Sequence, residues 1–165
     1  MPPVTSPQKW RPVLIWGLLV LSLDLLTKVL ACRLLSPLDP LEVIDGFFSL
    51  ILAFNTGVAF SLLADDGLGQ EVKMTLLATL SLLPFGFFSF IKANPRNRPL
   101  LTALGLIWGG ALGNIYDRLY RGAVTDFLDF QIQGHHWPAF NIADMAICLG
   151  AGLMTLCILK EKPPK

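Results

Sequence analysis

The segment VLIWGLLVLSLDLLTKVLA, from Val13 to Ala31, decides the fold class. A helix that crosses a membrane needs about 20 mostly apolar residues, and this segment has that length and character. Asp24 and Lys28 are its only charged residues. The segment therefore predicts a transmembrane helix that carries two charged side chains into the lipid bilayer.

The composition of the whole chain supports the same class. Of its 165 residues, 53% are hydrophobic and 15% are charged, whereas a soluble domain has about 25% charged residues. The high apolar content also excludes a disordered chain. A net charge of +1 gives no indication of nucleic-acid binding, and three scattered cysteines do not form a disulfide framework. We therefore expect an integral membrane protein.

Three further apolar segments have a similar character, over residues 74–91, 100–115 and 142–159. Together with residues 13–31 they predict a single integral membrane domain over residues 1–165, an all-α bundle of four transmembrane helices. A cleaved signal peptide is the alternative for the first segment, because VLAC at Val29–Cys32 resembles a lipidation site. The charges within that segment and the three spans after it favour a retained helix.

The distribution of charge predicts the orientation of these spans. Basic residues gather at one side of the expected bundle, with Glu161 as the only acidic residue there: Lys9, Arg11, Lys92, Arg96, Arg98, Lys160, Lys162 and Lys165. The loops of the other side are rich in Asp and Glu. Since Lys and Arg accumulate in cytoplasmic segments, we expect both termini inside, and the loops over about 33–73 and 117–141 outside.

The outer loops contain strand and turn patterns. Leu41–Ile44, the pair Asp45-Gly46 and the apolar run Phe47–Phe54 predict a hairpin, because Asp-Gly between apolar runs is a strong signal for a two-residue turn. Residues 55–63 could form a short helix with Asn55 at its N-cap. Residues 124–130 resemble another strand. We therefore expect a small extracytoplasmic β-sheet beside the helical bundle.

The two charges in the first span need an explanation, because charged groups inside a membrane are costly. Asp24 is expected in the outer third of the bilayer, and Lys28 lies one helical turn further out. An i, i+4 ion pair would make each charge tolerable. For the deeper Asp24, a polar cavity is the other interpretation.

Asp126 and Asp144 are candidates for catalysis. Asp144 opens the fourth span and Asp126 lies in the loop before it, so that folding of this loop can bring them together. Two carboxylates in one site of low polarity tend to share a proton, so that one can activate water while the other donates to a carbonyl. The spacing alone fits equally well a helix-terminal charge for Asp144 and a loop charge for Asp126.

Other catalytic arrangements lack necessary residues. His135 and His136 have no companion at metal-ligand spacing, and the serines show no nucleophile-elbow pattern. We therefore expect no metal and no other cofactor. Gly105, Gly109 and Gly113 form a small-xxx-small ridge, which predicts close helix packing.

Four strings in this sequence resemble the bacterial lipoprotein signal peptidase family, also called signal peptidase II. They are DLLTK (Asp24–Lys28), FNTGVAFSLL (Phe54–Leu63), GGALGNIYDRLYRGAVTDFLDF (Gly109–Phe130) and WPAFNIADMAI (Trp137–Ile147). The resemblance implies a four-helix aspartyl protease of the bacterial inner membrane with a small extracytoplasmic sheet. It also implies a substrate, a prolipoprotein cut on the amino side of a Cys that carries diacylglycerol, and inhibition by cyclic peptide antibiotics of the globomycin class.

The same resemblance implies the site residues. The catalytic pair falls on Asp126 and Asp144, whereas Asp129 matches a position that is not catalytic. The supporting polar shell falls on Asp24, Lys28, Asn55, Gly57, Asn114, Arg118, Asn141 and Ala143. We expect the three Asn residues and Arg118 to orient the substrate or the aspartates, and Gly57 and Ala143 to keep side-chain bulk away from the substrate.

Several interpretations remain open beside these. Arg118 could instead pair with Asp117 or Asp129 at the surface. Four aromatic residues could line a lipid groove or belong to the apolar core: Phe54, Phe60, Phe127 and Phe140. A small proton-coupled transporter and a non-catalytic assembly subunit are the competing functional classes. The clustering of polar residues at one side of the membrane argues against the transporter, and the pair of carboxylates flanked by Asn argues against the subunit.

Overall fold

The computed structural model describes residues 6–56 and 97–160. Its helices are α1 (Ser6–Leu34), α3 (Arg98–Arg121) and α4 (Ile142–Lys160). Each contains a stretch long and apolar enough to cross a membrane. The span expected over residues 74–91 lies outside the described residues, as do Gly57 and Phe60.

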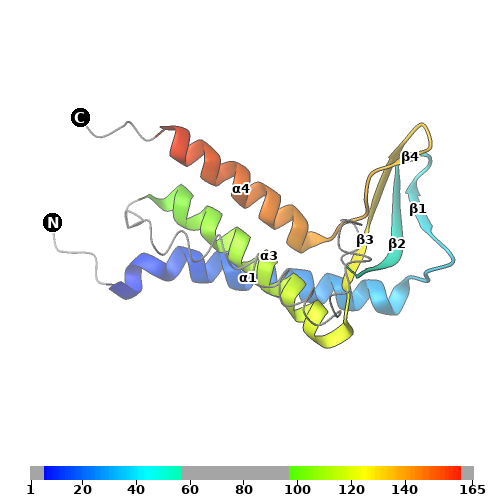
Figure 1. Ribbon diagram of the computed structural model, residues 1–165, viewed down its shortest axis with the longest axis horizontal. Coiled ribbons are helices and arrows are strands. Elements are labelled where there is room, and N and C mark those ends of the chain that lie inside the picture. Colours follow the sequence, from blue (N-terminus) through cyan, green and yellow to red (C-terminus); the bar gives the residue numbers. More distant parts are fainter. Residues whose placement is uncertain (1–5, 57–96, 161–165) are drawn as a thin grey trace, which may run out of the picture.

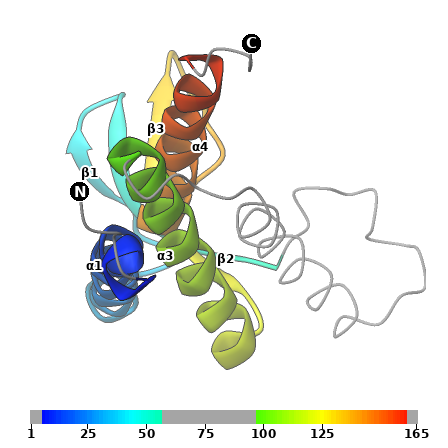
Figure 2. The same ribbon diagram turned by 90° about the vertical axis from the view of Figure 1, so that its left-hand side faces the viewer.

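Helix α3 is the central helix of the described bundle, between α1 and α4 (Figures 1 and 2). In its apolar stretch 61% of the residues are buried, compared with 28% in α1 and 17% in α4. The exposed residues of α1 and α4 include many leucines, such as Leu18, Leu19 and Leu149. Such surfaces suit contact with lipid.

The glycine ridge on α3 packs as predicted. Gly105 lies against Val13 and Trp16 of α1, and Gly109 lies against the backbone of Gly17. A side chain at either position would collide with these neighbours. The absence of side chains allows the two backbones to approach closely, which is how small residues hold helices together in membranes.

Helix α3 extends further than its apolar pattern predicted. Residues 117–121, expected in an outer loop, are helical. Gly122 ends the helix with φ 74, and its N–H donates to the carbonyl of Arg118. Only glycine adopts this left-handed conformation readily, so the end of the helix is set by a local signal rather than by hydropathy.

The small antiparallel sheet lies at one end of the helices (Figure 1). Its strands pair in the order β1 (Leu41–Ile44), β2 (Phe48–Asn55), β3 (Val124–Ile132) and β4 (His135–His136). The predicted hairpin and the strand near residues 124–130 are therefore confirmed. Asn55, expected to cap a helix, is the last residue of β2; the rest of that expected helix lies outside the described residues.

The hairpin turn differs from the prediction in length. Ile44 pairs with Phe48, so Phe47 belongs to the turn together with Asp45 and Gly46. The Phe47 N–H donates to the carbonyl of Ile44 over 3.0 Å, and Gly46 has φ 66. The Asp-Gly signal located the turn correctly, but the closing bond adds a third residue to the loop.

Candidate active site

Strand pairing brings Asp126 to the junction of sheet and helices. Asp126 lies on β3 opposite Ala53 of β2, and only 3% of its surface is exposed. Its Oδ1 accepts a hydrogen bond from Asn141 Nδ2 over 2.7 Å, and its Oδ2 accepts one from Asn55 Nδ2 over 3.1 Å. Residues from three separate segments of the chain therefore meet at one carboxyl group.

Asp144 is positioned by the N-terminus of α4. The Asp144 N–H donates to Asn141 Oδ1 over 3.0 Å, and Asp144 Oδ2 accepts from the Asn141 N–H over 3.3 Å. This reciprocal pair has the geometry of a capping box, with Asn141 as the cap. Asp144 Oδ1 also accepts from Asn114 Nδ2 of α3 over 2.8 Å.

Asn141 consequently joins the two aspartates. It is completely buried, and it contacts Asp144 through its backbone N–H and its Oδ1, and Asp126 through its Nδ2. Sequence spacing could not show this link, because it depends on the loop between β3 and α4 folding back. Burial is the largest of the causes that raise the pKa of Asp126 to about 6, and the nearby charge of Asp144 adds to it.

A buried ionic cluster between the helices contacts these residues. Lys28 Nζ lies 2.8 Å from Asp24 Oδ2, which confirms the expected i, i+4 ion pair. The same Nζ donates to Asn114 Oδ1 over 2.9 Å, and Asp24 Oδ1 accepts from the Ala143 N–H over 2.8 Å. The pair thus connects α1 to α3 and α4, and through Asn114 it reaches Asp144.

Asp117 is a member of this cluster that the sequence reasoning missed. It is buried, its Oδ2 accepts from the Thr125 N–H over 2.8 Å, and Arg121 Nε lies 3.2 Å from its Oδ1. Lys28 Nζ is 3.7 Å from it. The available signal was the i, i+4 spacing of Asp117 and Arg121, which required the helix to continue past residue 115.

Arg118 does not form the alternative ion pairs considered from the sequence. In the described part of the chain, Asp117 pairs with Arg121 and Lys28, and Asp129 pairs with His136. The Arg118 Nη1 donates to the carbonyl of Asn114 over 3.5 Å, and its buried Nε has no partner among the described residues. Its guanidinium lies within electrostatic range of Asp126 and Asp144.

The aromatic candidates are divided between two surroundings. Phe140 stacks on Phe130, with 5.8 Å between ring centroids, and Phe54 is half exposed. Phe127 borders an apolar cavity of about 250 Å³ between α1 and the sheet, whose other walls include Leu30, Leu41 and Leu50. Within residues 6–56 and 97–160, no group of three or more His, Cys, Asp or Glu residues could hold a metal ion.

Comparison with known proteins agrees with this arrangement. Residues 16–160 match the family model described as signal peptidase (SPase) II. The lipoprotein signal peptidase of Ralstonia nicotianae is 43% identical over 145 residues, which cover 88% of this chain and 82% of that protein. The lipoprotein signal peptidase of Oleidesulfovibrio alaskensis is 40% identical over 144 residues, 87% of this chain and 92% of that protein.

A solved structure shows the same fold. A bacterial membrane enzyme superposes with a TM-score of 0.77 at 31% identity, covering 91% of this chain and 94% of its own. The family match and the two relatives extend over both aspartates and the buried ionic cluster. The chain therefore belongs to the signal peptidase II family of membrane proteases.

Proposed function

We propose that this protein removes the signal peptide from diacylglyceryl-modified prolipoproteins, cutting on the amino side of the lipidated Cys, with Asp126 and Asp144 as the catalytic pair. The observation that carries the proposal is the link through the buried Asn141, which holds both carboxyl groups in one site. Membership of the signal peptidase II family favours this function over the transporter and the assembly subunit.

The surroundings of the two carboxyl groups suggest different roles for them. Asp126 has a pKa of about 6, raised mainly by burial, and therefore keeps a proton in weakly acidic conditions. Asp144 receives hydrogen bonds from Asn114 and from the Asn141 N–H in the first turn of a helix. Such donors stabilise a negative charge. We assign Asp126 as the proton donor and Asp144 as the base.

The reaction then proceeds in two steps. Asp144 takes a proton from water as the water oxygen bonds to the scissile carbonyl carbon, and Asp126 gives its proton to the carbonyl oxygen. In the second step the tetrahedral intermediate releases the amide nitrogen of the Cys, which receives the proton held by Asp144, while the proton of the former carbonyl oxygen returns to Asp126. The products are a carboxylic acid on the signal peptide, which then loses its remaining proton to water, and a free amine on the lipidated Cys.

The residues of the supporting shell have two kinds of role: some contact the aspartates or the substrate, and others hold the helices in position. Asn55, Asn114 and Asn141 orient the aspartates, and Arg118, with a buried Nε lacking a partner among the described residues, is placed to bind a substrate carbonyl. Asp24 and Lys28 position α3 and α4, through Asn114 and the Ala143 N–H. We keep Gly57 and Ala143 in their expected role of limiting bulk near the substrate.

The location of the protein follows from charge and arrangement. We propose four transmembrane helices in one domain, with the additional span over residues 74–91, in the bacterial inner membrane. Helix α4 ends and α3 begins at the end of the bundle opposite the sheet (Figure 1), near Arg98 and Lys160. Positive residues favour the cytoplasm, so both termini are placed inside and the aspartates at the extracytoplasmic face.

The partners of the site are a lipid-bearing peptide and the surrounding membrane. The diacylglycerol of the substrate would hold the scissile bond at the depth of the aspartates, and apolar surface beside Phe127 is available for acyl chains. We propose cyclic peptide antibiotics of the globomycin class as inhibitors that occupy the same site.

Cleavage of a diacylated prolipoprotein by purified variants tests this proposal. Asp126→Asn and Asp144→Asn should each abolish cleavage, because each removes a group that transfers a proton. Asp129→Asn is the matched control: it alters another buried aspartate on the same strand, which binds His136 instead of Asn141. Full activity in either catalytic variant would show the assignment to be wrong.

A further inference from the structure

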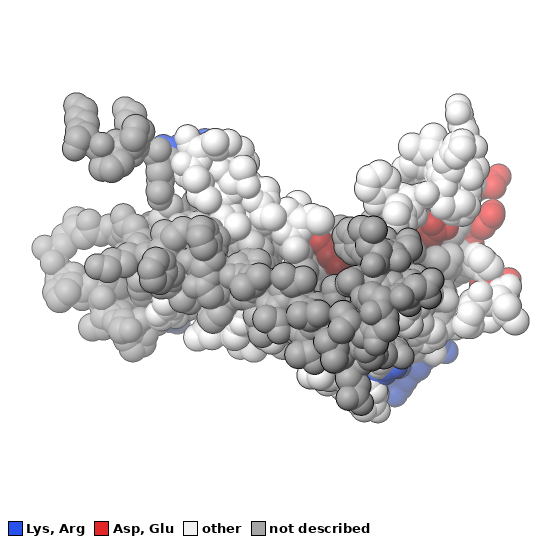
Figure 3. Space-filling view, viewed as in Figure 1, with Lys and Arg blue, Asp and Glu red and all other residues white. Residues whose placement is uncertain are grey.

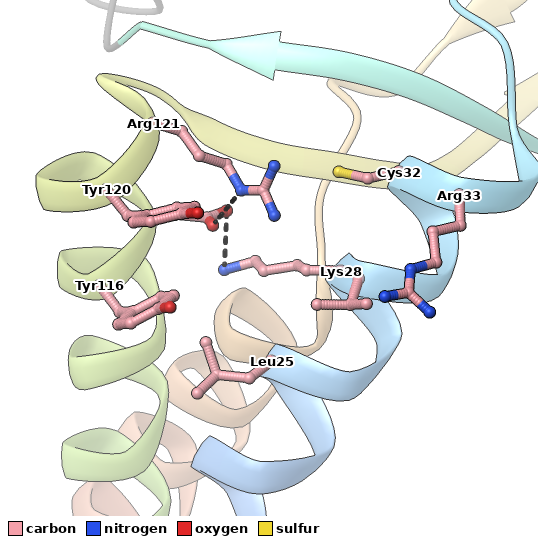
Figure 4. Close-up of a pocket in the computed structure, with 9 residues that line it drawn as sticks. Leu25, Lys28, Cys32, Arg33, Tyr116, Tyr120 and Arg121 are labelled. Carbon is pink, nitrogen blue, oxygen red and sulfur yellow. Dashed lines mark hydrogen bonds and ion pairs between the residues drawn. The ribbon is translucent and has the colours of Figure 1, made fainter.

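A second, cationic pocket lies between α1 and α3, at the ends of these helices that face the sheet (Figure 4). It has a volume of about 300 Å³, comparable with small-molecule sites. Its charged walls are Lys28, Arg33, Asp117 and Arg121. On the face shown in Figure 3, basic atoms gather apart from the acidic atoms around the strands.

The positive charge of this pocket is only partly neutralised. Asp117 is its single acidic residue, and it is already held by Lys28 and Arg121. Lys28 is also paired with Asp24 outside the pocket wall. Arg33 is exposed and forms no ion pair with any residue of the described chain. The pocket therefore has an excess of cations over anions.

Arginine donors remain available in this pocket. Arg121 uses its Nε to bind Asp117, which fixes the side chain, and its two terminal nitrogens have no acceptor among the described residues. Figure 4 shows these nitrogens pointing across the pocket toward α1, from which Arg33 also projects. A guanidinium fork matches the oxygens of both carboxylate and phosphate groups. Two such groups on opposite walls need more than two acceptor oxygens to be satisfied together, which a phosphate offers and a simple carboxylate or a halide does not.

The remaining walls are suited to a membrane surface. Tyr116 and Tyr120 are exposed on α3 and stack with 5.8 Å between ring centroids, and Arg121 lies over the Tyr120 ring. Tyrosines gather where a spanning helix leaves the lipid. Leu25 and Val29 line the pocket on the side of α1, so an apolar wall lies beside the cationic one.

We propose that this pocket binds a phosphate-bearing anion, supplied either by the headgroup of an anionic phospholipid or by free inorganic phosphate. The site is distinct from the aspartate pair and does not depend on the proposed hydrolysis. A cation in the last turn of a helix is favourable, and both Arg33 and Arg121 hold such positions. That role does not account for the two terminal nitrogens of Arg121, which point across the pocket (Figure 4) and have no acceptor among the described residues.

Native mass spectrometry of the full-length protein, released from nanodiscs that contain equal phosphatidylglycerol and phosphatidylcholine, tests the proposal. Wild type should retain phosphatidylglycerol preferentially, and Arg33→Gln should reduce that preference about fivefold, the effect of one basic residue near an anionic surface. Arg98→Gln is the matched control, since it removes an exposed arginine from the other end of α3. An equal loss in both variants, or no preference in wild type, would overturn the proposal.

A second measurement separates the two sources of phosphate. Thermal unfolding in detergent is compared in inorganic phosphate and in chloride at equal ionic strength. Stabilisation by phosphate that Arg33→Gln removes identifies free phosphate as a ligand, whereas lipid retention without such stabilisation identifies the phospholipid. If neither measurement depends on Arg33, the pocket does not bind phosphate. Arg33 is exposed and has no ion-pair partner in residues 6–56 and 97–160, so its replacement should leave the unfolding temperature in chloride unchanged.

Discussion

Asp126 titrates in a range where the reaction can be observed. An ordinary aspartate has a pKa of about 3.9, and burial raises that of Asp126 to about 6. As the proposed proton donor it must be protonated, so the kcat/KM for cleavage should decline as the pH rises above about 6. The Asp129→Asn variant should show the same decline. A kcat/KM that is constant between about pH 5 and about pH 8 would contradict the assignment.

The same shift has a consequence for stability, with a definite sign. Between about pH 4 and about pH 6 the folded protein keeps the Asp126 proton while the unfolded chain has lost it. The contribution of Asp126 to the free energy of unfolding is therefore present below this range and is lost as the pH rises through it. In Asp126→Asn this part of the pH dependence should be missing from thermal unfolding curves.

Asn141 offers a test of positioning at a single residue. Asn141→Ala removes the donor to Asp126 and the acceptor that caps α4. We expect kcat to fall about 100-fold, as displacement of a catalytic group by about 1 Å can cause, with a smaller change in KM. Asn97→Ala is the matched control, because Asn97 caps α3 in the same way, through the N–H of Leu100, without contact to the aspartates. Similar kcat values in the two variants would argue against positioning.

At the scale of elements, the packing of α3 against α1 determines whether the ionic cluster can form. Gly113 lies directly against the Asp24 carboxylate, and a Cβ there would be 3.0 Å from the Asp24 Cγ. Gly113→Ala should therefore displace Asp24 and lower both the unfolding temperature and the activity. Gly152→Ala is the control in α4, where a Cβ meets nothing within 4 Å; it should be neutral or stabilising by about 0.5–1 kcal/mol. Equal effects would show that packing at Gly113 is unimportant.

The elements differ in how far sequence could predict them. Hydropathy located all three described helices, and the Asp-Gly signal located the hairpin, because both are local properties. The continuation of α3 to Arg121 was missed, since its last turns are polar and hydropathy registers only the apolar part. The pairing of β2 with β3 joins residues about 70 positions apart, such as Ala53 and Asp126, and no local pattern encodes that contact.

The site shows the same division between chemistry and geometry. Asp126 and Asp144 could be proposed from residue type and from resemblance. The link through Asn141 could not, because it depends on how the segment between β3 and α4 returns to the bundle. The burial of Asp117 depends instead on the turn from α3 into β3, which brings the Thr125 N–H to its carboxylate.

At the scale of the whole molecule, Lys28 is the residue on which the helices converge. Its ammonium contacts Asp24, Asn114 and Asp117 while only 1% of the residue is exposed. Lys28→Met would leave two buried carboxylates without this cation, and removal of one partner from a buried ion pair costs about 3–5 kcal/mol. Lys160→Met, at the exposed end of α4, should have little effect. Unfolding in detergent measures both variants, and equal stabilities would refute the role of Lys28.

The hydrogen bond from Ala143 to Asp24 also bears on when the enzyme becomes active. Asp24 belongs to α1, the first of the described helices to be synthesised, and Ala143, beside the proposed base Asp144, belongs to α4, the last of them. A nascent chain that has not inserted α4 lacks this contact and the base together. Proteolytic competence therefore has to wait until α4 has docked against α1, because the proposed base arrives with that helix.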